Sequence, residues 1–116
     1  MAKASGATSL NVLASALLFG SRQLILDRVA ALRLPAIYQS PELAEEGGFG
    51  AYGPRLNQLF RDLARQVVKL FRGIKVADIP VEQPTTFELV INLKTTKAMG
   101  VTVPEGLLAR ADKVIE

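Results

Sequence analysis

The segment Gly48-Phe49-Gly50-Ala51-Tyr52-Gly53 has the G-x-G-x-x-G spacing of a loop that cradles the pyrophosphate of a dinucleotide. Such a loop joins a strand directly to a helix N-terminus, where backbone N–H groups and the helix dipole meet the phosphates. Here an expected short helix at 41–46 lies between the preceding strand and the glycines, so the match to a nucleotide site is weak. A plain turn with a packed tyrosine is the simpler interpretation.

Two polar side chains stand at the carboxyl ends of expected strands. Ser15 lies in the loop Ala14-Ser15-Ala16 after the strand 10–13, and Tyr38 ends the strand 35–38. Open parallel sheets bind ligands beside these strand ends. Ser15 either hydrogen-bonds a ligand or caps a nearby helix, and Tyr38 either faces the ligand or packs in the core.

The composition lacks the residues that most kinds of catalysis require. The chain has no His and no Cys, which excludes the commonest general base, thiolate chemistry and a disulfide framework. A P-loop and a nucleophile elbow are also absent from the sequence. The acidic cluster Glu42, Glu45 and Glu46 has no paired base or metal partner that the sequence reveals. We therefore predict that the protein is not an enzyme and uses no metal or cofactor.

The net charge of +3 is mild, and few aromatic residues stand among the basic ones. The basic residues of the expected helix 55–72 lie opposite its apolar stripe, as is typical of a solvated face. These are Arg61, Arg65, Lys69 and Arg72. We predict no binding to nucleic acid.

Hydrophobic spacing and capping signals predict alternating strands and helices. The expected strands cover residues 10–13, 35–38 and 87–93. The expected helices cover residues 21–32, 41–46 and 55–72, a short stretch that ends at Gly100, and residues 104–115 after a capping box from Thr102 to Glu105. Strands separated by helices indicate a single α/β domain over residues 1–116, a three-layer arrangement with a mostly parallel sheet flanked by helices.

The N-terminal region contains a faint likeness to a secretion signal. Lys3 precedes the apolar run 10–20, but Asn11 interrupts that run and Leu17-Leu18-Phe19 follows the A-x-A-like Ala14-Ser15-Ala16. We predict no signal peptide in this chain. No run approaches the roughly 20 apolar residues that a membrane span requires.

The most distinctive pattern covers residues 79–112. It begins with the run Ile79-Pro80-Val81-Glu82-Gln83-Pro84-Thr85-Thr86-Phe87-Glu88-Leu89-Val90-Ile91-Asn92-Leu93-Lys94. This run reads as a proline-bounded extended connector followed by a strand. It resembles the C-terminal end of the solute-binding proteins of a bacterial ABC-transporter family that includes tryptophan- and tyrosine-type receptors. The resemblance extends upstream through residues 47–54 and 33–38, back to about Gly6.

The resemblance implies the second lobe of a periplasmic binding protein, with the first lobe absent. It implies capture of a small ligand such as an amino acid, an ABC permease as partner, and a periplasmic location. Residues 47–53 would then be a ligand loop, with contacts from Gly48, Ala51, Tyr52 and Gly53 in addition to Ser15 and Tyr38. Related receptors often carry Ser in place of Ala51 and Asp in place of Thr8, which indicates a differently tuned pocket.

Two alternatives from other classes remain open. One is a small Rossmann-like nucleotide-binding domain, and the other is a self-associating structural protein without a ligand. Hydrophobic residues make up 49% of the chain, and a sheet of few strands leaves unpaired edges. Both features predict a homodimer.

Overall fold

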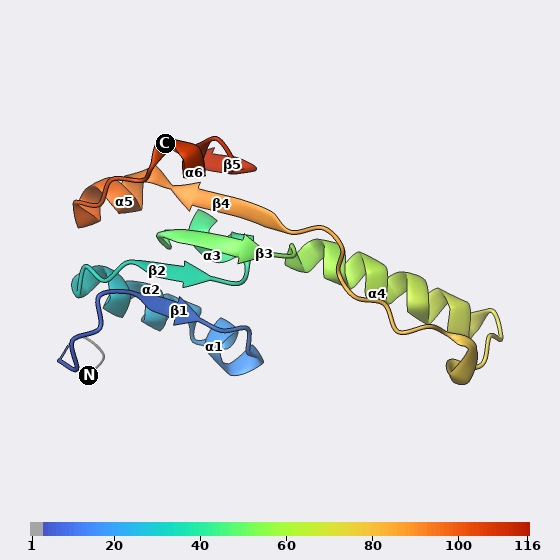
Figure 1. Cartoon of the computed structure of the whole chain (residues 1–116). Helices are drawn as coiled ribbons and strands as arrows, with labels where there is room; N and C mark the ends of the chain where they lie inside the picture. Colours follow the sequence, from blue (N-terminus) through green and yellow to red (C-terminus); the bar gives the residue numbers. More distant parts are fainter. Residues whose placement is uncertain (1–3) are drawn as a thin grey trace.

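A computed structural model describes residues 4–116, and Lys3 lies outside the described residues. A five-stranded sheet forms the body of the molecule, in the order β1-β2-β3-β4-β5 (Figure 1). The strands are β1 Leu10–Val12, β2 Ala36–Tyr38, β3 Gly50–Gly53, β4 Glu88–Asn92 and β5 Lys113–Ile115. Three of the four strand pairs are parallel, and β3 and β4 are antiparallel. The predicted α/β fold with a mostly parallel sheet flanked by helices is confirmed.

The helices follow local sequence signals. They are α1 Ala16–Gly20, α2 Arg22–Ala31, α3 Pro41–Glu45, α4 Leu56–Phe71, α5 Leu93–Met99 and α6 Glu105–Leu108, with a short 3-10 turn at Val76–Asp78. Ser40 occupies the N-cap of α3 and Pro41 its first turn, as predicted. Gly100 ends α5 at φ 73°, a left-handed conformation that disfavours residues with a Cβ. None of the helices within residues 4–116 is long and apolar enough to cross a membrane.

The core lies between one face of the sheet and the helices α2 and α3. Tyr38, Ala51 and Val90 pair in register across β2, β3 and β4, so their side chains share that face. Each of the three is fully buried. They pack in one cluster with Leu26 and Val29 of α2 and Leu43 and Ala44 of α3, which lie behind the sheet in Figure 1.

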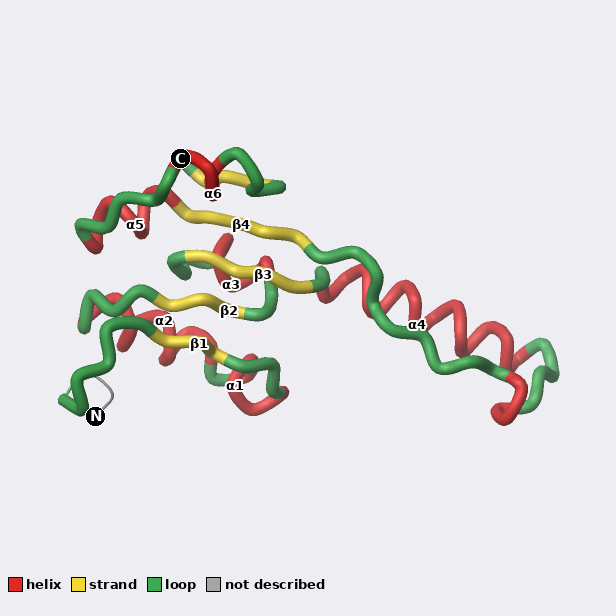
Figure 2. The backbone as a smooth tube through the Cα atoms, in the orientation of Figure 1, coloured by secondary structure: helices red, strands yellow, loops and turns green. Residues whose placement is uncertain are grey.

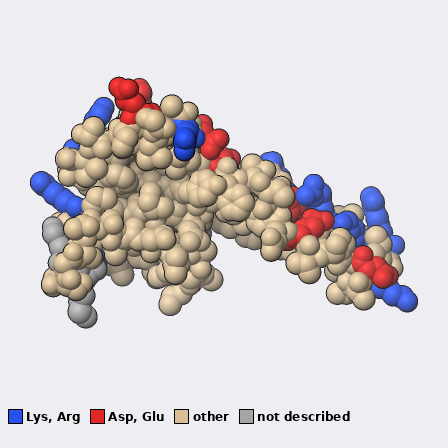
Figure 3. Space-filling view, in the orientation of Figure 1, with Lys and Arg blue, Asp and Glu red and all other residues tan. Residues whose placement is uncertain are grey.

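An arm extends from the body. After β3 the chain leaves the sheet as α4, and residues 74–87 return alongside that helix to β4 (Figure 2). The molecule measures 55 × 33 × 20 Å and its radius of gyration is 17.3 Å, whereas a compact domain of this size has a value of roughly 13 Å. No residue of α4 is buried. The arm therefore stands away from the core, with Lys and Arg gathered along it (Figure 3).

Three sequence-based predictions of local structure are wrong. Residues 50–53, expected within a loop, form β3 and pair with strands on both sides. The expected closing helix 104–115 is only α6, and the chain then forms β5, which pairs with β4. Pro104, not Thr102, occupies the N-cap of α6, and no side-chain capping bond forms there. Strands of three or four residues are too short to show a period of two, and only pairing with distant residues creates them.

Candidate functional site

A cavity of about 490 Å³ lies beside the carboxyl ends of β1, β2 and β3. These three strands are parallel, so the loops that follow them meet at one edge of the sheet. The first turns of α4 close the cavity on the side of the arm. The lining residues are Val12, Leu13, Ala14, Ser15, Ala16, Leu18, Phe19, Gln39, Ser40, Leu43, Pro54, Leu56, Leu59 and Phe60.

The wall of this cavity is mostly apolar. Among the described residues that line it, none carries a charge, and the polar side chains are those of Ser15, Gln39 and Ser40. A cavity with apolar walls and a few convergent polar groups is the usual form of a small-molecule site. It suits the apolar part of a ligand and offers no counter-charge to an ionised group.

Ser15 is the one residue of the predicted site that lines the cavity. It occupies the N-cap position of α1 in an extended conformation, but its side chain makes no capping hydrogen bond. The backbone N–H of Ala14 donates to Oε1 of Gln39 over 3.3 Å and joins the loops that follow β1 and β2. Because this bond uses the amide oxygen of Gln39, its NH₂ group is the part suited to donate to a ligand.

Tyr38, Gly48 and Ala51 are buried and do not line the cavity. Tyr38 is fully buried, and burial raises the pKa of its hydroxyl group. A Cβ at Gly48 would approach the Tyr38 ring and the Leu43 carbonyl oxygen to 2.8 Å. Because Gly48 has no side chain, its backbone packs closely against Tyr38 and Leu43, so its role is structural.

Tyr52 lies on the opposite face of the sheet from Ala51, because side chains alternate along a strand. Its side chain is 57% exposed and stacks on Phe87 with ring centroids 5.7 Å apart. Gly53 ends β3, where a Cβ would overlap the carbonyl oxygen of Gln39. Neither residue lines the cavity, although Gly53 permits the close approach that places Gln39 beside it.

The glycine spacing does not form a phosphate cradle. Gly50 to Gly53 are strand residues that pair with β2 and β4, and the segment to the next helix passes through Pro54 and Arg55. A cradle requires free backbone N–H groups at the start of a helix. The segment therefore lacks the glycine loop between a strand and a helix N-terminus that a nucleotide-binding site requires.

Sequence reasoning missed Gln39, Phe19 and Phe60 as cavity residues. Gln39 directly follows the strand that was expected at 35–38, so the rule for parallel strand ends could have identified it. Phe19 and Phe60 belong to helices whose placement against the sheet is visible only in the folded chain.

A network of ion pairs fixes the start of α4 against the body. Nε of Arg55 contacts Glu88 at 2.7 Å and its Nη2 contacts Glu45 at 2.9 Å, while Nζ of Lys113 contacts the same Glu45 oxygen at 2.9 Å. The hydrogen bond from Arg55, followed by that from Lys113, lowers the pKa of the Glu45 carboxyl group. The same contact with Glu45 raises the pKa of Arg55 above its ordinary value.

The acidic cluster Glu42, Glu45 and Glu46 is engaged in structural contacts, which are ion pairs and a helix cap. Glu46 pairs with Nε of Arg22 at 2.8 Å. Oε1 of Glu42 accepts the backbone N–H of Leu56 at 3.0 Å and so caps α4 from another helix. The Glu42 cap and the ion pairs of Arg55 orient the first turns of α4, from which Leu56 and Phe60 face the cavity.

Comparison with known proteins identifies a family. The family model described as ABC transporter substrate binding protein matches residues 6–115. No curated protein matches the chain.

Solved structures share the fold. An ABC domain from Streptococcus pneumoniae in complex with L-Trp matches with a TM-score of 0.86 and 24% identity, over 97% of this chain and 39% of that one. A conserved domain protein from Vibrio cholerae matches with a TM-score of 0.89 and 21% identity, over 97% of this chain and 38% of that one. The ligand-free, open structure of a substrate binding protein with adhesive properties from Clostridium difficile matches with a TM-score of 0.55 and 20% identity, over 91% and 36%. The chain thus spans about two fifths of the length of the structures it resembles.

Proposed function

The chain belongs to the ABC transporter substrate binding protein family, and on this premise we propose that it forms one lobe of a solute-binding protein that delivers a small ligand to an ABC importer. The observation that carries the proposal is the uncharged, mostly apolar cavity at the carboxyl ends of three parallel strands. Substrate-binding proteins of this kind act by binding, so we assign no catalytic residue.

We assign the ligand to the class of small molecules with an apolar part, such as an aromatic or branched amino acid. Leu13, Phe19 and Phe60 supply apolar contacts, while Ser15 and Gln39 supply hydrogen bonds. The complex of the Streptococcus pneumoniae domain with L-Trp supports this class. The ammonium and carboxylate groups of an amino acid need charged partners, which we expect from a second lobe.

The second wall of the binding site would close over this cavity by a hinge motion. The chain leaves the sheet at Pro54 and returns at Phe87, both at the edge where the cavity lies. We place the hinge at these two crossings, beside the ion pairs of Arg55. Tyr52 and Phe87 are exposed at the same edge, where a closing lobe would cover them.

Within this proposal the six residues expected from the sequence divide into two groups. Ser15 contacts the ligand directly, and Tyr52 lies at its margin. Tyr38, Gly48, Ala51 and Gly53 support the strands that carry the loops. The permease is the proposed partner of the closed protein, and the periplasm its proposed location.

Titration of the isotope-labelled chain with L-tryptophan, followed by NMR, tests the proposal. Because one lobe makes only part of the contacts while the cost of association stays the same, we expect millimolar affinity or weaker. Backbone signals of Ser15, Gln39 and Phe60 should shift, while those of Val68 on the outer face of α4 should not.

The variant Phe60→Ala should abolish these shifts, and Phe71→Ala at the far end of the same helix should preserve them. Each variant removes one exposed ring from the arm. If both variants abolish the shifts, the loss arises from the arm and not from the cavity. Shifts confined to residues 50–53 on addition of NAD would instead favour the nucleotide-binding alternative. Micromolar affinity of the monomer for L-tryptophan would contradict the need for a second lobe.

A further inference from the structure

The polar side chains of the cavity come from two neighbouring loops. Ser15 belongs to the loop after β1, while Gln39 and Ser40 directly follow β2. Because β1 and β2 are adjacent parallel strands, these loops meet at one edge of the sheet. The other lining residues are apolar. We call Ser15, Gln39 and Ser40 the polar patch of the cavity.

Neither serine of the polar patch uses its hydroxyl group to cap a helix. Ser15 and Ser40 occupy the N-cap positions of α1 and α3, and both have the extended backbone that is typical there. A serine hydroxyl group at an N-cap commonly accepts a backbone N–H from the first turn of its helix. Within residues 4–116, neither side chain makes such a bond. Both hydroxyl groups therefore remain available to a ligand.

The amide group of Gln39 has a fixed orientation. Its Oε1 accepts the backbone N–H of Ala14 over 3.3 Å. Because a backbone N–H can only donate, the oxygen of the amide group and not its nitrogen must lie at this bond. The backbone of Gln39 is also fixed, since a Cβ at Gly53 would overlap its carbonyl oxygen. The NH₂ group is left with two N–H donors that have no partner among the described residues.

The polar patch therefore acts mainly as a hydrogen-bond donor. It offers the NH₂ group of Gln39 and two hydroxyl groups, whereas Oε1 of Gln39 is already engaged with Ala14. An ammonium group carries donors only, so it would meet N–H groups where it needs acceptors. An ionised carboxylate group would accept from these donors, but no described residue that lines the cavity carries a charge to balance its own. The patch suits an oxygen atom that accepts hydrogen bonds and has no charge.

We propose that Gln39 determines the specificity of this lobe, and that the ligand carries an uncharged oxygen acceptor, such as a carbonyl group, on its apolar part. The NH₂ group of Gln39 donates to this oxygen, and the hydroxyl groups of Ser15 and Ser40 lie beside the same contact. This inference rests on the proposed function, because it concerns the same cavity, and it narrows the class of ligand. The indole ring of L-tryptophan has no oxygen acceptor, so it contacts only the apolar wall.

Small probes that share a benzene ring test the inference by NMR titration of the isotope-labelled chain. Acetophenone carries an uncharged oxygen acceptor, phenylacetate an anionic one, and benzylamine a cationic donor. We expect acetophenone to bind at least about threefold more tightly than either charged probe, the effect of one added hydrogen bond. Acetophenone should also shift the side-chain Nε2–H signals of Gln39, because its carbonyl oxygen accepts from them, and benzylamine should not.

The variant Gln39→Glu changes the donor and keeps the shape of the side chain. One oxygen of the new carboxylate group still accepts the backbone N–H of Ala14, so the two loops stay joined, and the other replaces the NH₂ group. We expect the order of the probes to reverse, so that benzylamine binds more tightly than acetophenone. A purely structural role of Gln39 would weaken all probes equally.

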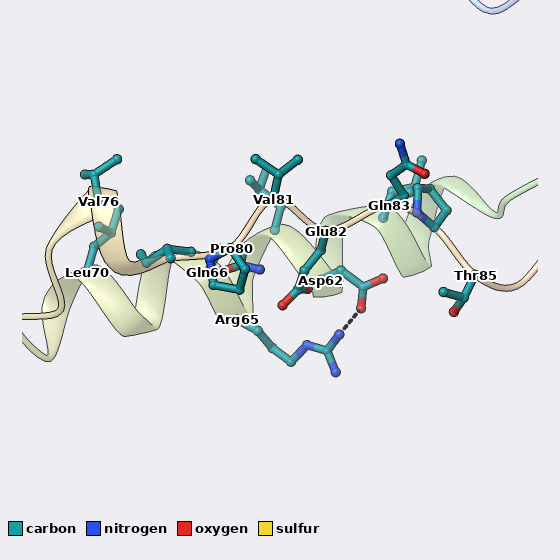
Figure 4. Close-up of a pocket in the computed structure, with 14 residues that line it drawn as sticks. Asp62, Arg65, Gln66, Leu70, Val76, Pro80, Val81, Glu82, Gln83 and Thr85 are labelled. Carbon is teal, nitrogen blue, oxygen red and sulfur yellow. Dashed lines mark hydrogen bonds and ion pairs between the residues drawn. The ribbon is translucent and has the colours of Figure 1, made fainter.

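Gln83→Glu is the matched control for the added charge. Gln83 lies on residues 74–87, which return alongside α4, and it borders a different groove of about 760 Å³ (Figure 4). It does not line the cavity. This variant should leave the order of the probes unchanged.

Two results overturn this inference alone. One is equal affinity of the unchanged chain for the three probes, and the other is tighter binding of phenylacetate or benzylamine than of acetophenone. In both cases the proposed function stands if L-tryptophan shifts the signals of the cavity residues. If neither L-tryptophan nor any probe shifts those signals, the inference and the proposed function both fail. The comparison of probes on the unchanged chain decides the matter even if Gln39→Glu does not fold.

Discussion

The two tyrosines of this chain have the same side chain and opposite environments. Tyr38 was expected on the ligand side because it ends an expected strand, and Tyr52 because the resemblance implies a ligand loop over residues 47–53. Tyr38 points to the face that α2 and α3 cover and is fully buried, whereas Tyr52 points to the other face and is 57% exposed. The alternation of side chains along each strand produces this difference, because the face of each tyrosine depends on the register of its strand.

The buried hydroxyl group of Tyr38 has no hydrogen-bond partner among the described residues. We expect Tyr38→Phe to leave the free energy of unfolding unchanged or to raise it slightly, because it removes an unsatisfied polar group. Tyr38→Ala should lower it by about 3–5 kcal/mol through loss of a buried ring. Urea denaturation measures both changes.

Tyr52→Ala serves as the control for this prediction, with an expected cost below about 1 kcal/mol because the ring is largely exposed. A large loss on Tyr38→Phe would show that the hydroxyl group has a partner in solution. A large loss on Tyr52→Ala would place that ring in the core and remove it from the margin of the site.

At the scale of elements, the junction between the sheet and α4 is held by charge. Arg55 links α3 to β4 through Glu45 and Glu88, and Lys113 adds β5 to the same network. The side chains of Arg55 and Glu45 are 23% and 26% exposed, so solvent only partly screens their contact. Since Phe60 and Leu56 reach the cavity from the first turns of α4, this network also determines the shape of the proposed site.

The lowered pKa of Glu45 predicts a pH dependence of stability. The folded chain binds fewer protons at Glu45 than the unfolded chain, so the contribution is complete above the ordinary value of 4.5. It is lost as the pH falls through the lower value of the folded state. We expect the free energy of unfolding to fall less steeply for Glu45→Gln than for the unchanged chain between about pH 5 and about pH 3.

Urea denaturation at several pH values in low salt measures this difference. Glu105→Gln is the matched control, because Glu105 is an exposed residue of α6. Its pH profile should coincide with that of the unchanged chain. Parallel profiles for Glu45→Gln and the unchanged chain would mean that the ion pairs do not form in solution.

At the scale of the whole molecule, the arm accounts for the departure from a compact shape. The radius of gyration of 17.3 Å belongs to a body with α4 and residues 74–87 extended from it. Small-angle scattering of the chain, at concentrations where light scattering gives the mass of a monomer, should give a value close to 17.3 Å. A value near 13 Å, typical of a compact domain of this length, would show that the arm folds against the sheet.

Much of the fold could be predicted from the sequence, because many signals are local. Pro41 after Ser40, the stripe of α4 and the stop at Gly100 each act within a few residues and define the ends of helices. The run from Ile79 to Lys94 was sufficient to identify the family, and the match over residues 6–115 confirms it. The position of Ser15 at the edge where the cavity lies could be predicted because the rule for parallel strand ends requires only the order of the elements.

Tertiary structure alone decided the rest. Residues 50–53 and 113–115 are strands only because distant strands pair with them. The cavity draws on three loops and on α4, and whether Tyr38 or Gln39 faces it depends on which side of the sheet the helices cover. Burial and strand pairing are contacts between residues far apart in the chain. Local propensity and spacing carry no information about which of these contacts form. The sequence therefore determined most of the helices and the family, and the folded chain determined the short strands and the cavity.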